Sequence, residues 1–309
     1  MKYRKLGNTG LDVSILGYGA SPLGSVFRDV DESEGIRTVH EALDLGINLI
    51  DVSPYYGLTK AETVLGKALA TVPRDRYILS TKAGRYGSDE FDFSAERIAR
   101  SIEESMNRLN VDHIDILHLH DIEFGDLEQV IEESIPALER LKEQGKIRFY
   151  GVTGLPLAIY PKVLDRIHVD TIINYCHYSL NDTTLADLLP YFASKGTGVI
   201  SASPLSMGLL SVRGAPEWHP ADEEIKQYCQ RAAAYCADRG EDIAKLALQF
   251  SVSHEQIPTT LTGTANPENI RKNVQWIEEP IDELLLQEVQ EILQPIMNRT
   301  WPSGREENQ

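Results

Sequence analysis

Residues 48–57 read NLIDVSPYYG, and this stretch decides the fold that we expect for the chain. A short apolar run, typical of a buried strand, ends in the carboxylate of Asp51. A turn bounded by Pro54 and Gly57 then presents two tyrosines, of which Tyr56 lies five residues after the acid. Strands of an α/β barrel present active-site side chains in this way, because their carboxyl ends meet on one face.

Two later apolar runs end in the same manner, residues 77–82 on Lys82 and residues 114–120 on His120. A tyrosine hydroxyl has a pKa of about 10, which a lysine ammonium within roughly 4 to 6 Å would lower. A carboxylate beside that lysine would keep it charged, and a histidine can donate a hydrogen bond to a reacting carbonyl oxygen. We therefore expect four side chains to form one proton-transfer site: Asp51, Tyr56, Lys82 and His120.

Strand-like and helix-like segments alternate along most of the chain. Extended segments at residues 3–6 and 11–14 suggest an N-terminal hairpin, and the further strands are expected at 15–20, 48–52, 77–81, 114–119, 149–153, 171–175, 199–203 and 259–262. Helices are expected at 34–45, 61–70, 95–109, 127–144, 157–166, 184–194, 243–253 and 267–276. This alternation favours an α/β fold of the (β/α)8 TIM barrel type over a doubly wound open sheet, although strand patterns alone do not prove closure.

Two segments exceed this scheme. Residues 208–221 form a turn-rich insertion after the seventh barrel strand, followed by an additional helix at 222–239, and residues 282–295 predict one more amphipathic helix near the C-terminal end. Long loops in compact domains are commonly functional. Because no repeat or linker divides the sequence, we expect a single domain over residues 1–309.

The composition is that of an ordinary globular protein with an excess of acid. There are 47 Asp and Glu residues against 30 Lys and Arg residues, and the resulting net charge of −17 argues against nucleic acid and membrane surfaces as partners. The three cysteines lack CxxC spacing, which predicts neither a metal site nor a redox pair and suits a reducing compartment. Because the N-terminus lacks a signal-type apolar segment, we expect a cytoplasmic protein, either a monomer or a homodimer.

Several segments together resemble the aldo-keto reductase superfamily. They are residues 51–57, the Ser80-Thr81-Lys82 strand end, residues 114–120, and SPL at 203–205 followed by GLL at 208–210. The resemblance implies a barrel that binds a nicotinamide cofactor without a Gly-rich dinucleotide fold, and the sequence shows no GxGxxG turn opening a helix. It also implies Tyr56 as general acid and base, tuned by Lys82 and Asp51, with His120 orienting the reacting oxygen.

Further segments resemble plant sugar dehydrogenases within that superfamily. They include EFDFSAER at 90–97, PEWHPA at 216–221 and TWPSG at 300–304, and the likeness runs from Lys5 to Gly304. It implies NAD-dependent oxidation of the C1 hydroxyl of L-galactose, or of a close aldose, to a lactone, a step that feeds ascorbate synthesis in plants. Three alternatives stay open: a related aldose dehydrogenase such as one for L-fucose, a carbonyl reductase preferring NADPH, and a non-catalytic nicotinamide-binding regulatory subunit.

The superfamily resemblance also implies positions for cofactor contacts. Thr153 stands where relatives usually carry a serine that holds the carboxamide, and either Asn174 or Tyr175 stands where a glutamine is common. Asn269 falls near the place of an arginine that grips the 2′-phosphate in NADP-dependent relatives, which favours NAD, although Arg271 and Lys272 are close. The expected cofactor contacts are Thr153, Asn174, Tyr175, Ser203, Pro204, Leu205, Gly208, Gly263, Thr264, Asn269 and Asn273.

The loops expected above the barrel mouth supply the substrate candidates, since a sugar suits polar groups beside an aromatic face. These candidates are Tyr55, Arg85, Asp121, His177, Trp218 and His219. Cys176 ends a strand on the same rim, and we expect its thiol to be exposed to substrate or oxidants. His118 shares the facing of His120 by strand alternation, and we interpret it as a hydrogen-bonded core residue.

Overall fold

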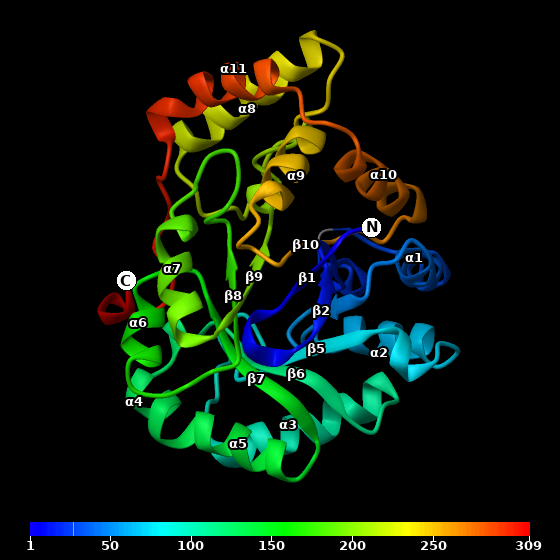
Figure 1. The fold of residues 1–309 in the computed structure, drawn as a ribbon, viewed down its shortest axis with the longest axis vertical. Coiled ribbons are helices and arrows are strands. Elements are labelled where there is room, and N and C mark those ends of the chain that lie inside the picture. The colour runs from blue at the N-terminus through cyan, green and yellow to red at the C-terminus, as the bar shows by residue number, and fades with distance from the viewer. Residues whose placement is uncertain (27) are drawn as a thin grey trace.

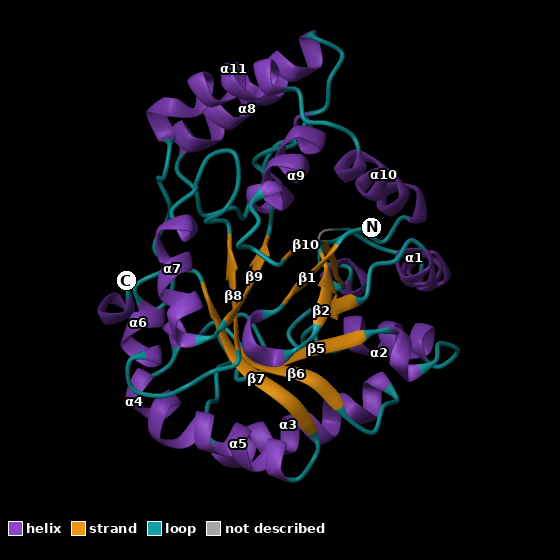
Figure 2. Cartoon of the chain, in the orientation of Figure 1, coloured by secondary structure: helices purple, strands orange, loops and turns teal. Residues whose placement is uncertain are grey.

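The computed structural model describes residues 1–26 and 28–309, and Phe27 lies outside the described residues. Its centre is a closed barrel of parallel strands in the order β10-β3-β4-β5-β6-β7-β8-β9 (Figures 1 and 2). The strands are β3 (Leu16–Gly19), β4 (Leu49–Asp51), β5 (Ile78–Ala83), β6 (Ile114–Leu119), β7 (Ile147–Gly154), β8 (Thr171–Tyr175), β9 (Gly198–Ala202) and β10 (Thr259–Thr262). The predicted (β/α)8 barrel is therefore confirmed and the open sheet is excluded.

The predicted N-terminal hairpin is also confirmed. Strands β1 (Tyr3–Lys5) and β2 (Asp12–Ser14) pair antiparallel. Apolar residues around them, Leu6 and Val13 among them, pack against Leu49 and Ile78, which begin their barrel strands. The hairpin thus covers the end where the strands begin and leaves the opposite end open for a site.

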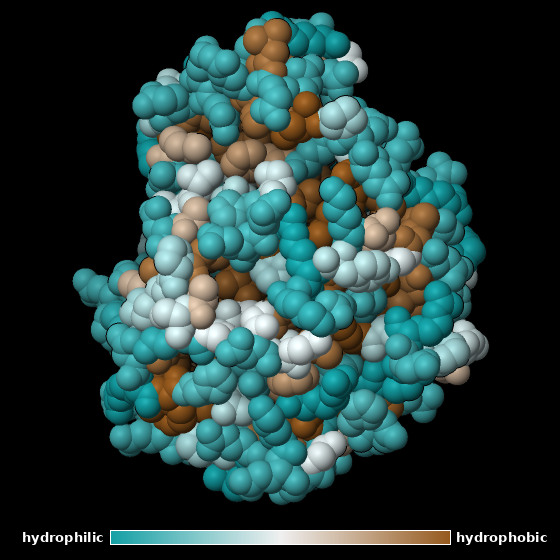
Figure 3. Space-filling model, in the orientation of Figure 1, coloured by the Kyte–Doolittle hydropathy of each residue, from teal (hydrophilic) through white to brown (hydrophobic). Residues whose placement is uncertain are grey.

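Helices surround the barrel. They are α1 (Glu32–Asp44), α2 (Lys60–Leu69), α3 (Ala95–Leu109), α4 (Leu127–Gln129), α5 (Ile135–Glu143), α6 (Ile159–Leu164), α7 (Leu185–Lys195), α9 (Ile243–Ser253) and α10 (Pro267–Glu278). The two additional predicted helices are present as α8 (Glu223–Asp238) and α11 (Glu283–Leu293), which pack against each other beyond the barrel (Figure 1). The face shown in Figure 3 is mostly hydrophilic, in keeping with the charged composition, and among the described residues no helix is long and apolar enough to span a bilayer.

The helix predicted over residues 127–144 is divided. A π-helical segment, Val130–Ser134, separates α4 from α5, and the N–H of Ile135 donates to the carbonyl of Val130. Pro136 has no N–H for the usual helical bond, and the Ser134 hydroxyl donates to the carbonyl of Phe93 at 2.5 Å. The wider turn therefore follows from one missing donor and one tertiary contact.

Strand β5 positions part of the site. It runs two residues farther than predicted, so Lys82 lies inside the strand and not after it. Every residue of β5 and β6 is buried. Polar members of these strands, Lys82 and His118 among them, must therefore find partners within the barrel, because a buried polar group without a partner is costly.

Candidate active site

The four side chains expected to form a proton-transfer site are brought together by three neighbouring strands. Asp51 ends β4, Lys82 lies near the end of β5, and His120 directly follows β6. The Lys82 ammonium donates to Asp51 Oδ2 at 2.5 Å, to the carbonyl of Val52 at 3.0 Å and to Tyr56 Oη at 3.2 Å. All three ammonium protons are thus engaged, and one of them reaches the phenol.

Burial and nearby charges set the protonation states of Lys82 and Tyr56. Burial alone would lower the pKa of Lys82, but the Asp51 carboxylate and Tyr56 outweigh it and raise the pKa to about 12. Burial raises the pKa of Tyr56 above its ordinary value, and the nearby Lys82 opposes that rise without cancelling it. Lys82 thus acts on the pKa of Tyr56 in the predicted direction, but burial of the phenol outweighs the ammonium and the net shift is upward. Tyr56 is a protonated phenol at neutral pH, beside a lysine that stays charged.

His120 is neutral. Burial lowers the pKa of its imidazole to about 3, against the opposing charge of Asp121. Its ring meets the rings of Tyr55 and Tyr56 edge-on, with centroid distances of 5.9 and 5.7 Å. Its Nδ1 lies 3.0 Å from Ser53 Oγ. A neutral imidazole in this position can donate one hydrogen bond to an oxygen held next to Tyr56, and it cannot act as a cation there.

Arg85 and Asp121 form a charged wall beside the four residues. Arg85 Nη1 lies 2.5 Å from Asp121 Oδ2, and the guanidinium carbon lies 4.1 Å from the centre of the Tyr55 ring. Phe91 and Phe124 stack on each other at 4.5 Å below the same guanidinium. Three substrate candidates, Tyr55, Arg85 and Asp121, are thus assembled together. Arg85 is held in one orientation, since its charge is paired and its faces are covered by aromatic rings.

The Thr153 hydroxyl and the Asn174 side-chain nitrogen form hydrogen bonds within the fold, whereas Asn174 Oδ1 is buried without a hydrogen-bond partner among the described residues. Thr153 Oγ1 accepts from the Asp121 N–H at 2.9 Å and donates to Asp121 Oδ1 at 3.2 Å. The buried Asn174 amide donates to the carbonyls of Gly154 and Leu155 at 2.9 and 3.0 Å. Neither lines the groove described next, nor does Tyr175, which is half-buried. Their expected role as cofactor contacts stays a prediction.

A groove of about 580 Å³ runs from Asp51 and Tyr56 to Asn269 in the first turn of α10. It joins Asp51 and Tyr56 to six of the expected cofactor contacts: Ser203, Pro204, Leu205, Gly208, Gly263 and Asn269. Thr264 and Asn273 line an adjoining cavity of about 250 Å³ together with Leu205 and Asn269. Asn269 and Asn273 make only long side-chain bonds, 3.4 Å to Thr264 and 3.5 Å to Thr262. The groove and the adjoining cavity together bring eight of the expected cofactor contacts to one side of the barrel mouth.

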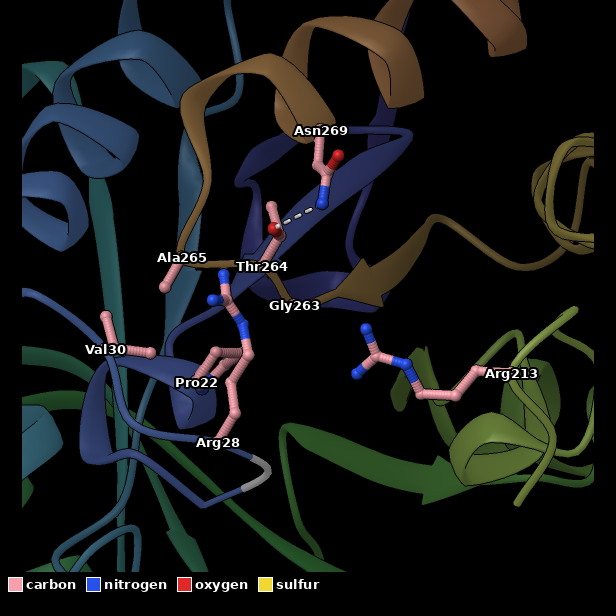
Figure 4. A pocket seen from close by; sticks show the side chains of 8 residues that line it. All are labelled: Pro22, Arg28, Val30, Arg213, Gly263, Thr264, Ala265 and Asn269. Atoms are coloured by element: carbon pink, nitrogen blue, oxygen red, sulfur yellow. Dashed lines mark hydrogen bonds between the residues drawn. The ribbon is translucent and has the colours of Figure 1, made fainter. Parts of the chain in front are cut away.

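Two arginines near the Asn269 end were missed by the sequence reasoning. Arg28 and Arg213 come from loops after β3 and β9 and line a pocket of about 330 Å³ with Gly263, Thr264 and Asn269 (Figure 4). Neither forms an ion pair with any described residue, and both guanidinium groups reach toward the segment after β10 in Figure 4. In a chain of net charge −17, two unpaired cations at one pocket fit an anionic group. Their place in long loops above the barrel mouth was the available sequence signal.

Two histidine candidates have structural partners. The His177 Nδ1 lies 3.1 Å from Asp182 Oδ2 and 3.0 Å from the Thr184 hydroxyl, and its Nε2 is buried with no hydrogen bond to a described residue. His219 is buried, and its ring nitrogens contact the carbonyl of Ser206 and the N–H of Ala221. His219 therefore holds the 208–221 loop in place.

Two further candidates differ in burial, since one is exposed and the other lies in the interior. Trp218 is 54% exposed and stacks beside the ring of His219. Cys176 is buried in an apolar cluster with Leu180 and Leu209, and burial raises the pKa of its thiol. The prediction of an exposed Cys176 thiol is wrong, because the side chain packs inside this apolar cluster at the start of the loop after β8.

Glu123 links the loop after β6 to the C-terminal residues. Its Oε1 accepts from the N–H of Leu155 at 3.0 Å and from the Ser303 hydroxyl at 2.9 Å, and its carbonyl accepts from the N–H of Arg305 at 2.9 Å. Burial, reinforced by the charge of Asp121, raises the pKa of Glu123 to about 8. The segment from Ser303 onward is thus fastened next to the substrate side by a carboxyl group that is neutral at pH 7.

Known proteins share this fold and much of this sequence. A model of the aldo/keto reductase family matches residues 15–294. L-galactose dehydrogenase of Arabidopsis thaliana is 54% identical, over 100% of this chain and 99% of the relative. D-threo-aldose 1-dehydrogenase of a Pseudomonas species is 30% identical, over 86% of this chain and 90% of the relative. An aldo-keto reductase from Bacillus halodurans, solved in its holo form, superposes with a TM-score of 0.80 at 28% identity, covering 100% of this chain and 99% of that one.

Proposed function

Because the chain belongs to the aldo/keto reductase family, whose members are oxidoreductases that bind a nicotinamide cofactor, we propose that it oxidises the C1 hydroxyl of L-galactose, or of a close aldose, with NAD. The product is the aldonolactone, since the ring oxygen remains on the carbon that loses hydride. The observation that carries the proposal is the hydrogen-bonded line Asp51–Lys82–Tyr56 at one end of the groove. It stands in a chain 54% identical to an L-galactose dehydrogenase.

The side chains divide the proton chemistry among themselves. The reacting form of Tyr56 is the phenolate, which has first released its own proton to solvent and then accepts the proton of the sugar hydroxyl on Oη. Lys82, held charged by Asp51, donates a hydrogen bond that stabilises this phenolate. His120 donates to the same sugar oxygen and fixes its position. When bound, an oxidised nicotinamide supplies the hydride acceptor and a positive charge that favours the phenolate form of Tyr56.

The groove supports NAD rather than NADP. Arg28 and Arg213 line the pocket at Asn269 and supply two cations for a phosphate group of the cofactor, which a protein of net charge −17 needs locally. Asn269 is neutral, and Arg271 is held by Glu41 through two contacts of 2.6 and 2.7 Å. The choice of NAD rests on these two positions, since position 269 lacks the arginine of NADP-dependent relatives and the arginine at position 271 is paired.

The substrate side supports a sugar. Asp121 and Arg85 offer an acceptor and donors beside the Tyr55 ring, which is the combination that hydroxyl groups on a pyranose require. We include His177 and Trp218 in this proposal as further contacts, because the His177 Nε2 has no partner among the described residues and Trp218 is half exposed. The aldose 1-dehydrogenase relative from Pseudomonas agrees with oxidation at C1 of a sugar.

A substrate panel tests the proposal. Purified protein is incubated with L-galactose, L-fucose, D-arabinose and D-glucose and with either NAD or NADP, while the absorbance of the reduced cofactor is followed. We expect the largest kcat/KM with L-galactose and NAD. Turnover confined to aldehydes with NADPH would assign a carbonyl reductase instead, and cofactor binding without turnover of any substrate would assign a regulatory subunit.

A further inference from the structure

His118 in β6 and His120 directly after it are both buried, and each contacts at least one hydroxyl group. His118 contacts Ser80 and Thr171, and His120 contacts Ser53. A neutral imidazole carries its single N–H on either Nδ1 or Nε2, and the two nitrogens then act as donor and acceptor. The neighbouring groups decide which nitrogen is protonated, and here they decide differently for the two rings.

The direction of the bonds around His118 follows from Asp51. The Asp51 carboxylate, paired with Lys82, can only accept, so the Ser80 hydroxyl spends its proton on Asp51 Oδ1 at 2.8 Å. The His118 Nδ1, 3.2 Å from the same Ser80 oxygen, must then be the donor. The Thr171 hydroxyl donates to the remaining nitrogen, Nε2, at 2.9 Å. His118 is therefore the Nδ1–H tautomer.

The bonds around His120 run the other way. Ser53 Oγ accepts the backbone N–H of Tyr55 at 3.1 Å, and the only described acceptor within reach of its own proton is His120 Nδ1 at 3.0 Å. Ser53 is fully buried, so a hydroxyl proton without an acceptor would be costly. His120 Nδ1 therefore accepts, and the ring proton lies on Nε2. That nitrogen is 3.7 Å from Asp121 Oδ2, which favours a donor at this position.

We propose that Ser53 is a positioning residue that fixes His120 as the Nε2–H tautomer, while Ser80 fixes His118 in the opposite, Nδ1–H tautomer. The inference rests on the proposed role of His120 in orienting the sugar oxygen. In the Nε2–H form His120 presents a donor to that oxygen, whereas the other form would present a lone pair and repel it. The arrangement at His118 also gives the Asp51 carboxylate a second donor, Ser80, so that its other oxygen is directed at Lys82.

Nuclear magnetic resonance of the full-length protein, labelled with 15N at histidine, tests the tautomers directly. Two-bond 1H–15N correlations distinguish a protonated from an unprotonated ring nitrogen, and loss of one ring in His120→Gln identifies the His120 signals. We expect Nε2–H for His120 and Nδ1–H for His118. A protonated Nδ1 at His120 in the unaltered protein overturns the proposal.

Substitutions test whether each serine sets the tautomer of its own histidine, as distinct from the general effect of losing a buried hydroxyl. Ser53→Ala should change the tautomer signature of His120 and leave that of His118, and Ser80→Ala should do the reverse. Ser201→Ala is the matched control, because Ser201 is buried in β9 and its hydroxyl has no hydrogen-bond partner among the described residues. If Ser53→Ala does not fold, Ser53→Cys, which keeps a weaker donor, should give a mixture of both His120 forms. An unchanged His120 signature in the variant that folds overturns the proposal.

Kinetics add a readout that a merely structural serine would not move. Ser53→Ala should lower kcat by about tenfold while the Kd of NAD, measured by quenching of protein fluorescence, stays the same. Ser53→Cys should recover part of the loss. If the resonances show the expected tautomers but no aldose is oxidised, the proposed function fails while the assignment of Ser53 stands; if aldoses are oxidised and Ser53→Ala keeps full kcat, the assignment fails alone.

Discussion

The two ends of the groove differ in how far their polar groups are paired within the protein. At one end Lys82 is buried, and its ammonium makes contacts of 2.5 to 3.2 Å with Asp51, Val52 and Tyr56. At the other end the side chain of Asn269 makes one long bond of 3.4 Å, and Arg28 and Arg213 have no ion-pair partner among the described residues. The end proposed to move a proton has thus satisfied its polar groups internally. The end proposed to hold the cofactor keeps its polar groups available for a ligand, so the two ends should respond differently to substitution.

The largest effect should come from the phenol itself. Tyr56→Phe removes the proton acceptor and leaves the ring, so kcat for sugar oxidation should fall by about a thousandfold. The Kd of NAD should stay nearly constant, because the cofactor end of the groove is untouched. Steady-state kinetics and fluorescence titration measure the two quantities. If Tyr56→Phe retained turnover, the proton-transfer role of this end would be misassigned, and the proposed difference between the two ends would fail.

Asp51→Asn tests whether that end depends on charge and not only on shape. The amide keeps the volume but removes the carboxylate that raises the pKa of Lys82, so the ammonium is weakened as a partner for the phenolate. We expect kcat to fall by about a hundredfold. The pH profile of kcat should shift to higher pH as well, because Tyr56 loses stabilisation of its ionised form. An unaltered profile would contradict the role given to Lys82.

The cofactor end should show the opposite pattern. Arg28→Met combined with Arg213→Met should raise the Kd of NAD by roughly tenfold and change kcat little. Added salt should weaken NAD binding in the unaltered protein and much less in the double variant, since screening acts on the two cations. Arg231→Met, an exposed arginine on α8, is the control. A large fall in kcat at saturating NAD would remove the distinction between the two ends.

A smaller effect concerns stability and pH. Burial raises the pKa of Glu123 from its ordinary 4.5 to about 8. Between these values the unfolded chain has lost the proton and the folded protein retains it, so stability falls as pH rises through this window and levels off above it. Glu123→Gln should flatten the dependence of the melting temperature on pH, by several degrees across the window. Glu217→Gln, an exposed loop carboxylate, should not. If the melting temperature depended on pH equally in the unaltered protein and in both variants, the raised pKa of Glu123 would be contradicted.

The sequence predicted that Asp51, Tyr56, Lys82 and His120 lie together, because this grouping depends on order along the chain. Asp51, Lys82 and His120 stand at the ends of consecutive strands, and parallel strands in a barrel bring such ends together whatever the details of packing. The net direction of the Tyr56 pKa could not be predicted in the same way. It depends on how burial of the phenol compares with the charge of one lysine, and burial is known only once the fold is complete.

The cofactor end and the loops were harder to predict for a related reason. Arg28 and Arg213 matter because no described carboxylate reaches them, and the absence of a partner is a property of the whole fold. Cys176 is buried by packing against Leu180 and Leu209, and the Ser134 hydroxyl beside the π-helical segment meets a carbonyl 41 residues away in sequence. Local patterns carry no information about any of these contacts.

Closure of the barrel pairs residues 16–18 of β3 with residues 260–262 of β10. Contacts between residues so distant along the chain form slowly. During synthesis the edge of β3 that pairs with β10 therefore stays unpaired until β10 has been made. The residues of the proton-transfer end are all present once position 120 has been made, whereas Gly263 and Asn269 arrive with the closing strand. A chain stalled before that point would expose unpaired strand edges and be prone to aggregate. NAD added during refolding should therefore favour the closed barrel alone, and the yield of binding-competent protein would report how many chains have finished folding.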